Sequence, residues 1–242
     1  MLNKPKRIII SPPFGNYLNF DWATSVSGTF TLEKRSGLIK QTIKTIRPVE
    51  NGWVNRIGFR NKGLRNVRTF TNDRIYSCTD ISCRRDWKEM LDILPKSIMV
   101  EINLGCPNVR RSYITSDILL ECNARFDFVS VKIPPTKEAL RYIGFARDNG
   151  VRTVHLCNTI PTERGGESGK RLKELTLPLI EETKKRFPEL TVIGGGGIYE
   201  PQDVIDYHNA GADYFSLATI FFTPWKVKKV KKQIDKIPTI ML

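Results

Sequence analysis

A cysteine that stands between a glycine and a proline is the residue of this sequence best suited to move a proton. This residue, Cys106, lies in the segment Glu-Ile-Asn-Leu-Gly-Cys-Pro-Asn, residues 101–108. Gly105 permits a close approach of another group, and Pro107 fixes the direction of the chain. A thiol whose pKa is slightly lowered exchanges a proton near neutral pH. We interpret Cys106 as a general acid–base residue; an inert buried cysteine is the alternative, and it suits the other four cysteines.

Four asparagines form a second candidate group: Asn55, Asn103, Asn108 and Asn158. Each side chain carries both a donor and an acceptor. Gathered around one mouth, they can hold a ligand with alternating carbonyl and N–H groups, such as a pyrimidine ring. Taken singly, each is more often a turn or cap residue.

Two glycine-rich segments are suited to phosphate. Gly165–Gly169 precedes a predicted helix, and residues 192–198 follow a predicted strand. Backbone amides without a Cβ nearby can wrap a phosphate, and a helix N-terminus adds a favourable dipole. Tight turns alone are the alternative for either segment. Together, at the ends of two late strands, they favour a phosphate site.

Two lysines stand near predicted strand ends. Lys132 lies in Val-Lys-Ile-Pro-Pro, and Lys44 follows Thr42-Ile43. A fixed positive charge at such a place can stabilise an anionic cofactor ring, such as a reduced flavin. An exposed lysine on the rim is the alternative for each.

The elements that must position these residues alternate along the chain. Eight β-rich runs are predicted, at Ala23–Ser27, Gln41–Ile46, Arg74–Cys78, Ile98–Leu104, Phe128–Ile133, Thr153–Cys157, Thr191–Gly194 and Tyr214–Ala218. Helices are predicted at Thr31–Ile39, Arg85–Leu94, Thr136–Asn149, Arg171–Phe187, Pro201–Ala210 and Pro224–Lys236, with a short one near Ser116–Asn123. Such alternation predicts a small (β/α)₈ barrel, with an open doubly wound sheet as the alternative. The polar residues above follow the strands, where barrel enzymes do their chemistry, and residues 47–72 are predicted to form a long ordered loop over the mouth.

Composition narrows the class of protein. The 242 residues, of which 40% are apolar, fit one domain with a real core. No apolar run has the length of a membrane span or a signal peptide, so we expect a cytoplasmic protein without a membrane partner. Five scattered cysteines and two histidines predict no disulfide framework and no metal site. The net charge of +14 suits either a nucleic-acid partner or, as we favour, a solvated basic surface that includes the lysines of the last helix.

Several spaced motifs, in order, are similar to those of a known family. From about Ala23 to Pro224 the sequence resembles the dihydroorotate dehydrogenases, in particular the soluble class that uses a cysteine base. The matching segments are Val26-Ser27-Gly28, Lys44-Thr45, Asn55-Arg56-Ile57-Gly58-Phe59, Asn103-Leu104-Gly105-Cys106-Pro107-Asn108, Val131-Lys132-Ile133-Pro134-Pro135, Asn158-Thr159, Gly166-Glu167-Ser168-Gly169, Gly196-Gly197-Ile198 and Ala218-Thr219.

The resemblance implies one FMN-binding barrel over residues 1–242 that oxidises dihydroorotate to orotate in pyrimidine biosynthesis. Cys106 would remove a proton from C5 while a hydride leaves C6 for flavin N5. The implied substrate residues are Lys44, Asn55, Asn103, Asn108, Asn158 and Thr159. The implied FMN residues are Ser27, Gly28, Lys44, Thr45, Asn103, Lys132, Gly169, Gly196, Gly197, Ala218 and Thr219.

Three departures from the family keep alternatives open. The chain is several tens of residues shorter, in regions that usually carry dimer contacts and active-site covers, so a homodimer stays open. Ala218 stands where glycine is usual. Gly105 replaces a serine, and Asn-x-Gly-Cys-Pro is also the spelling of the tRNA dihydrouridine synthases, which are FMN barrels too. A barrel that has lost turnover and only binds flavin or another ligand is a third hypothesis.

Overall fold

Eight parallel strands close into a barrel in the computed structural model, which describes residues 3–81, 85–105 and 114–238. Around the ring the order is β1-β12-β11-β8-β7-β6-β5-β2, and β2 returns to β1. The strands are β1 (Ile8–Ile10), β2 (Thr24–Phe30), β5 (Arg74–Cys78), β6 (Met99–Asn103), β7 (Phe128–Ile133), β8 (Thr153–Leu156), β11 (Thr191–Gly195) and β12 (Tyr214–Leu217). The predicted (β/α)₈ architecture is therefore confirmed.

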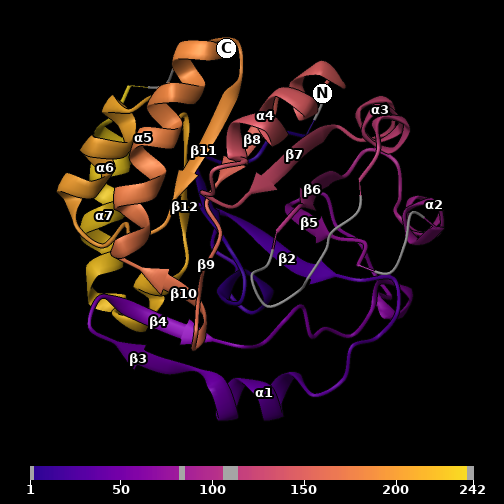
Figure 1. The fold of residues 1–242 in the computed structure, drawn as a ribbon, viewed down its shortest axis with the longest axis horizontal. Helices are drawn as coiled ribbons and strands as arrows, with labels where there is room; N and C mark the ends of the chain where they lie inside the picture. Colours follow the sequence, from indigo (N-terminus) through magenta and orange to yellow (C-terminus); the bar gives the residue numbers. More distant parts are fainter. Residues whose placement is uncertain (1–2, 82–84, 106–113, 239–242) are drawn as a thin grey trace.

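Helices surround this barrel (Figure 1). They are α2 (Arg85–Ile93), α3 (Ser116–Arg125), α4 (Ala139–Asp148), α5 (Arg171–Arg186), α6 (Pro201–Asn209) and α7 (Pro224–Lys236). All six were predicted to within a few residues, because each is an amphipathic helix with apolar residues along one face. In α7, Val230 and Ile234 are buried while Lys228, Lys229 and Lys232 are exposed. The C-terminal lysines therefore form the solvated face that we expected.

A small antiparallel sheet stands beside the barrel, in the order β3-β4-β10-β9 (Figure 1). Its strands are β3 (Arg47–Val49), β4 (Gly52–Asn55), β10 (Gly165–Gly169) and β9 (Ile160–Thr162). Part of the loop predicted over residues 47–72 therefore forms two strands of this sheet, β3 and β4. The segment Gly165–Gly169 forms a third strand, β10. Gly52 is required here, because a Cβ on it would lie 1.9 Å from the carbonyl oxygen of Ser168.

The N-terminal part of the fold corrects two predictions. The run Gln41–Ile46 is not a barrel strand; it lies largely in the helix α1 (Leu38–Thr45), which has no buried residue. The place in the barrel is taken by β1, whose three isoleucines are fully buried between β12 and β2. The helix predicted over Thr31–Ile39 is also wrong, because that segment stays irregular until α1 begins after Gly37, which has φ +90°.

The described residues also include three short 3₁₀ helices, η1 (Phe14–Asn16), η2 (Leu64–Asn66) and η3 (Thr219–Phe222). In the described ranges, no helix is long and apolar enough to cross a membrane. The same residues contain no cluster of three or more side chains placed to hold a metal ion.

The barrel interior is layered. An apolar floor of Ile9, Val26, Ile75, Met99 and Ile193 fills one end, separately from the larger core between barrel and helices. Side chains two residues further along a strand point to the same side. The next interior positions after Ile75 and Met99 are Ser77 and Glu101, so a polar layer follows directly above the floor.

Candidate active site

Glu101 and His155 form the centre of the polar layer. Glu101 on β6 is paired with Ser77 on β5 and with Ser130 on β7, and His155 on β8 is paired with Lys132 on β7. Glu101 Oε2 lies 2.7 Å from His155 Nδ1, and Glu101 Oε1 accepts a hydrogen bond of 2.8 Å from Ser77 Oγ. Both side chains of the pair are almost completely excluded from solvent.

The charge of this pair follows from its surroundings. Burial alone would raise the pKa of Glu101, but the positive charge of Lys132 and the donors His155 and Ser77 outweigh it and hold the pKa at about 2. Burial, followed by the charge of Lys132, lowers the pKa of His155. The pair is therefore a carboxylate and a neutral imidazole at neutral pH, with the imidazole proton on Nδ1. His155 Nε2 is buried without a partner among the described residues.

Lys132 supplies the positive charge above this pair. It lies two residues after Ser130 on β7, beside Asn103 in register, and only 8% of it is exposed. No ion pair or hydrogen bond of its ammonium is found within residues 3–81, 85–105 and 114–238. A nearly buried ammonium that balances Glu101 at a distance, without a direct hydrogen bond or ion pair of its own in the described residues, is suited to an anionic ligand group.

Two of the predicted asparagines meet at the mouth. Asn158 Nδ2 donates to Asn103 Oδ1 at 3.1 Å and also to the carbonyl oxygen of Gly105. Asn103 Oδ1 accepts from the Gly105 amide at 3.2 Å, and Thr159 N donates to Asn158 Oδ1 at 2.9 Å. These contacts hold Gly105, the residue before Cys106, from both sides. Cys106 and Asn108 themselves lie outside the described residues.

Asn55 lies on the small sheet. It ends β4 opposite Gly166 on β10, with 3.5 Å between Asn55 Nδ2 and the Gly166 carbonyl oxygen. Its Oδ1 accepts a hydrogen bond of 3.2 Å from Ile57 N. The small sheet therefore connects Asn55 to the glycine-rich segment after β9.

The two predicted phosphate segments come together. A Cβ on Gly197 would lie 2.9 Å from the Gly169 carbonyl oxygen and 3.0 Å from the Cα of Lys170, and the φ of Gly197 is +79°. Both features require glycine at position 197. Gly196 also has a positive φ, of +93°. The turn after β11 thus packs against the chain just before α5 begins at Arg171.

Thr219 and Ala218 follow β12 on the other side of this turn. Tyr199 Oη donates to Thr219 Oγ1 at 2.6 Å, so Thr219 lies beside the segment that begins with Gly196. Ala218 precedes η3 with φ −140°, a value that does not require glycine. The replacement of the family's usual glycine is therefore tolerated by the backbone.

Ser27 and Gly28 lie in the middle of β2 with different surroundings. Ser27 Oγ accepts a hydrogen bond of 2.6 Å from Arg74 Nη1. Gly28 N donates to Asn16 Oδ1 at 2.8 Å, and the Gly28 carbonyl oxygen accepts from Asn16 Nδ2 at 3.1 Å. Asn16, which the sequence did not single out, thus holds the backbone at Gly28.

Lys44 and Thr45 lie on α1 and not at the end of a barrel strand. Lys44 is exposed, and Thr45 Oγ1 accepts from Arg56 N at 3.0 Å while donating to the Gln41 carbonyl oxygen. In the part of the chain that the structure describes, no contact joins Lys44 to Lys132 or to the asparagines. The predicted strand position of Lys44 is wrong, and its role at the site stays a prediction.

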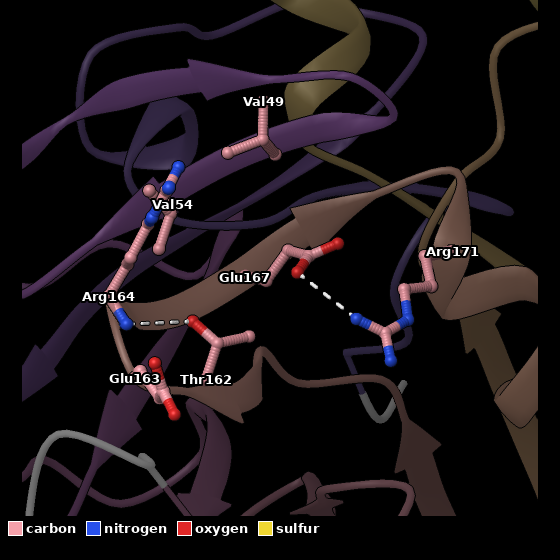
Figure 2. A pocket seen from close by; sticks show the side chains of 7 residues that line it. All are labelled: Val49, Val54, Thr162, Glu163, Arg164, Glu167 and Arg171. Carbon is pink, nitrogen blue, oxygen red and sulfur yellow. Dashed lines mark hydrogen bonds and ion pairs between the residues drawn. The ribbon is translucent and has the colours of Figure 1, made fainter.

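A cleft of about 330 Å³ lies over the small sheet (Figure 2). It is lined by Val49, Val54, Thr162, Glu163, Arg164, Glu167 and Arg171. Glu167 Oε2 and Arg171 Nη1 are 3.5 Å apart across one wall. Of the residues predicted for catalysis or cofactor binding that the structure describes, none lines this cleft.

Sequence reasoning missed Glu101, His155, Ser77 and Thr29. One signal was present for Glu101, because it precedes Asn103 by two residues on a predicted strand and must share its face. His155 and Ser77 are single polar residues within apolar runs, so only the closed barrel shows that they meet.

Comparison with known proteins decides the family. A family model for dihydroorotate dehydrogenase matches residues 14–238. The chain belongs to the dihydroorotate dehydrogenase family. This is a family of oxidoreductases, and the match confirms the resemblance that the motifs indicated.

Relatives and solved structures agree with this family. The catalytic subunit of dihydroorotate dehydrogenase B (NAD(+)) from Thermotoga maritima is 26% identical, and the alignment covers 97% of this chain and 98% of that protein. The protein of the same name from Bacteroides fragilis is also 26% identical, over 81% of this chain and 75% of its own. The Eimeria tenella dihydroorotate dehydrogenase solved with ferulenol has a TM-score of 0.71 at 17% identity, over 94% of this chain and 80% of that chain, and shares the fold.

Proposed function

We propose that this chain oxidises dihydroorotate to orotate with bound FMN, in the manner of a catalytic subunit. The observation that carries the proposal is the meeting of Lys132, Asn103 and Asn158 above a buried carboxylate, at the end of the barrel where such enzymes do their chemistry. Family membership supplies the class of reaction, and these residues supply a site for it.

The glycines fit the phosphate of FMN. The backbone around Gly169 and Gly197 leaves no room for a Cβ at position 197, and α5 begins beside this turn. Helix N-termini and bare amides are suited to bind a phosphate. Gly169, Gly196, Gly197 and Thr219 would therefore hold the phosphate, and Lys132 would approach the flavin ring. Bound FMN supplies the hydride acceptor of the reaction.

The asparagines would bind the pyrimidine ring. Asn103 and Asn158 are already fixed by one another and by Gly105, so they lose little conformational freedom when a ligand binds. Asn55, Asn108 and Thr159 are proposed to complete the substrate site. Each amide offers both a donor and an acceptor, as the ring's carbonyl and N–H groups require.

Cys106 is proposed as the base that takes the proton from C5 of dihydroorotate. Its support is the fixed backbone of Gly105 directly before it, which Asn103 and Asn158 hold at its amide and its carbonyl oxygen. Cys157, which lies between the end of β8 and Asn158, is poorly suited to this role, because burial raises the pKa of its thiol to about 11. A thiol with that pKa is rarely deprotonated at neutral pH.

The electrons would pass to a partner polypeptide linked to NAD⁺. The relatives from Thermotoga maritima and Bacteroides fragilis are named as catalytic subunits of an NAD(+)-dependent enzyme, which supports this acceptor for the present chain. Membership of the dihydroorotate dehydrogenase family also favours dihydroorotate over the uridine of tRNA, the alternative that Gly-Cys-Pro left open.

Anaerobic mixing tests the proposal directly. The FMN-reconstituted protein is mixed with dihydroorotate in the absence of oxygen while the flavin spectrum is followed. Bleaching of the flavin band, with orotate formed in equal amount, is the expected result. A protein that binds FMN but whose flavin stays oxidised would instead support the hypothesis of a barrel without turnover.

A further inference from the structure

A continuous row of hydrogen bonds connects Glu101 to the two asparagines of the mouth. Ser77 Oγ lies 2.8 Å from Glu101 Oε1 and 3.0 Å from Thr29 Oγ1. Asn103 Nδ2 lies 2.9 Å from the same Thr29 oxygen, and Asn103 Oδ1 meets Asn158 Nδ2 at 3.1 Å. The row starts in the buried polar layer and ends among the residues proposed to bind substrate.

The charge of Glu101 decides the direction of the hydroxyl bonds in this row. An ionised carboxylate only accepts hydrogen bonds. The single hydroxyl proton of Ser77 must therefore go to Glu101, so Ser77 can only accept from Thr29. The Thr29 proton is then used as well, and the Thr29 oxygen must accept. Asn103 has to present its NH₂ group to Thr29.

Backbone groups of Gly105 and Thr159 require the same orientation of the two amides at the mouth. With its nitrogen turned to Thr29, Asn103 directs its oxygen to the Gly105 amide and to Asn158. Asn158 must then present its nitrogen to Asn103, and its oxygen accepts from Thr159 N. A reversal of either amide would exchange a donor for an acceptor, and a ring with a fixed pattern of carbonyl and N–H groups would lose its match.

We propose that Glu101 is a positioning residue that, together with the backbone groups of Gly105 and Thr159, sets the donor and acceptor directions of Asn103 and Asn158 for the substrate. The inference rests on the proposed function, because it concerns recognition at that same site. A carboxylate buried in a barrel is expensive to maintain, and a role in packing alone is met by an uncharged side chain. Only an obligate acceptor gives the row a single direction, since a neutral amide or acid can donate in its place.

Variants of Thr29 provide the sharpest test, because this residue is half-buried and the changes are small. Thr29→Val keeps the shape and removes the hydroxyl, whereas Thr29→Ser keeps the hydroxyl. Orotate binding to the oxidised holoenzyme is measured from the change in the flavin spectrum. We expect Thr29→Val to weaken orotate about tenfold, and Thr29→Ser to stay within about twofold of the parent protein.

Glu101→Gln and Ser77→Ala extend the test along the row, with Ser130→Ala as the matched control. Ser130 is a buried serine beside Glu101 in register, and its Oγ has no partner among the described residues. Both row variants are expected to raise KM for dihydroorotate by about tenfold while the FMN content stays at the parent level. Ser130→Ala is expected to change neither quantity.

The outcomes distinguish a failure of this inference from a failure of the proposed function. Orotate binding by Thr29→Val at the parent affinity, or equal losses in Thr29→Val and Thr29→Ser, would overturn the role of Glu101 while the proposed function stands. A parent holoenzyme that neither binds orotate nor is reduced by dihydroorotate would overturn the proposed function, and this inference with it.

Discussion

Glu101 Oε2 and His155 Nδ1 lie 2.7 Å apart in the barrel interior, but the two residues do not form an ion pair. Glu101 is a carboxylate, and His155 is a neutral imidazole. The cation that balances Glu101 is Lys132, one layer closer to the mouth. The negative charge is thus held below the site and the positive charge beside the place proposed for the flavin ring. This separation has consequences for stability and for binding that can be measured.

The first prediction concerns acid stability. The pKa of Glu101 is lowered from 4.5 to about 2 in the folded chain, so the unfolded chain binds more protons between these values, and folding stability falls as the pH drops through them. The lowered pKa of His155 acts with the same sign below its ordinary value of 6.5. Denaturant unfolding at a series of pH values should show a loss of about 3 kcal/mol for Glu101 alone. Glu101→Gln should show a shallower slope below pH 4.5, and an unchanged slope would contradict the assignment.

The second prediction concerns the turn after β11. Gly197→Ala places a Cβ 2.9 Å from a carbonyl oxygen at a φ of +79°, so the turn must distort. We expect FMN affinity to fall by about tenfold or more, because this strain is of the order of 1–3 kcal/mol. Gly144→Ala in α4 is the matched control, since its nearest neighbour would be 3.7 Å away. Titration of each variant with FMN, followed by flavin fluorescence, measures the two affinities. Equal FMN affinity in Gly197→Ala and Gly144→Ala would exclude Gly197 from the phosphate site.

Most of the fold from Arg74 onward could be predicted, because strand and helix periodicities are local. The N-terminal part could not. Gln41–Ile46 holds four β-branched residues, which favours a strand locally, yet it lies mostly in α1. The barrel position goes to Ile8–Ile10, because that triplet pairs with β12 from the far end of the chain. No local pattern contains that pairing.

The candidate site shows the same division. Asn103, Lys132 and Asn158 could be predicted to converge, because the ends of neighbouring parallel strands share one rim of a barrel. The row from Glu101 to Asn103 could not, since it passes through three strands and depends on the direction of each hydrogen bond. Lys44 was misplaced because the motif around it fits the family, while its segment takes a different structure here.

The third prediction compares lysines. Lys132→Gln removes a nearly buried cation proposed to face the flavin, so the reduced anionic ring loses stabilisation. The midpoint potential of bound FMN should fall by about 30 mV or more, which for two electrons corresponds to about 1.4 kcal/mol. Lys40→Gln, an exposed change on α1, is the control. A potential that is unchanged in Lys132→Gln would remove this lysine from the flavin site.

The same measurement addresses Lys44. Its exposed position on α1 leads us to expect a smaller change in potential for Lys44→Gln than for Lys132→Gln. The reverse order would mean that the role implied by the Lys-Thr motif holds despite the helix.

The last prediction concerns the proton at C5. Cys106→Ser should retain FMN but slow its reduction by dihydroorotate at neutral pH, because a hydroxyl is far harder to deprotonate than a thiol. Stopped-flow reduction should show partial recovery as the pH rises. Cys157→Ser serves as the comparison, because the raised pKa of Cys157, about 11, leaves its thiol protonated at neutral pH. If Cys157→Ser slows reduction as much as Cys106→Ser does, Cys106 is not the base. If both variants reduce the flavin slowly only at low pH, the group whose protonation limits the reaction is another residue at the mouth of the barrel.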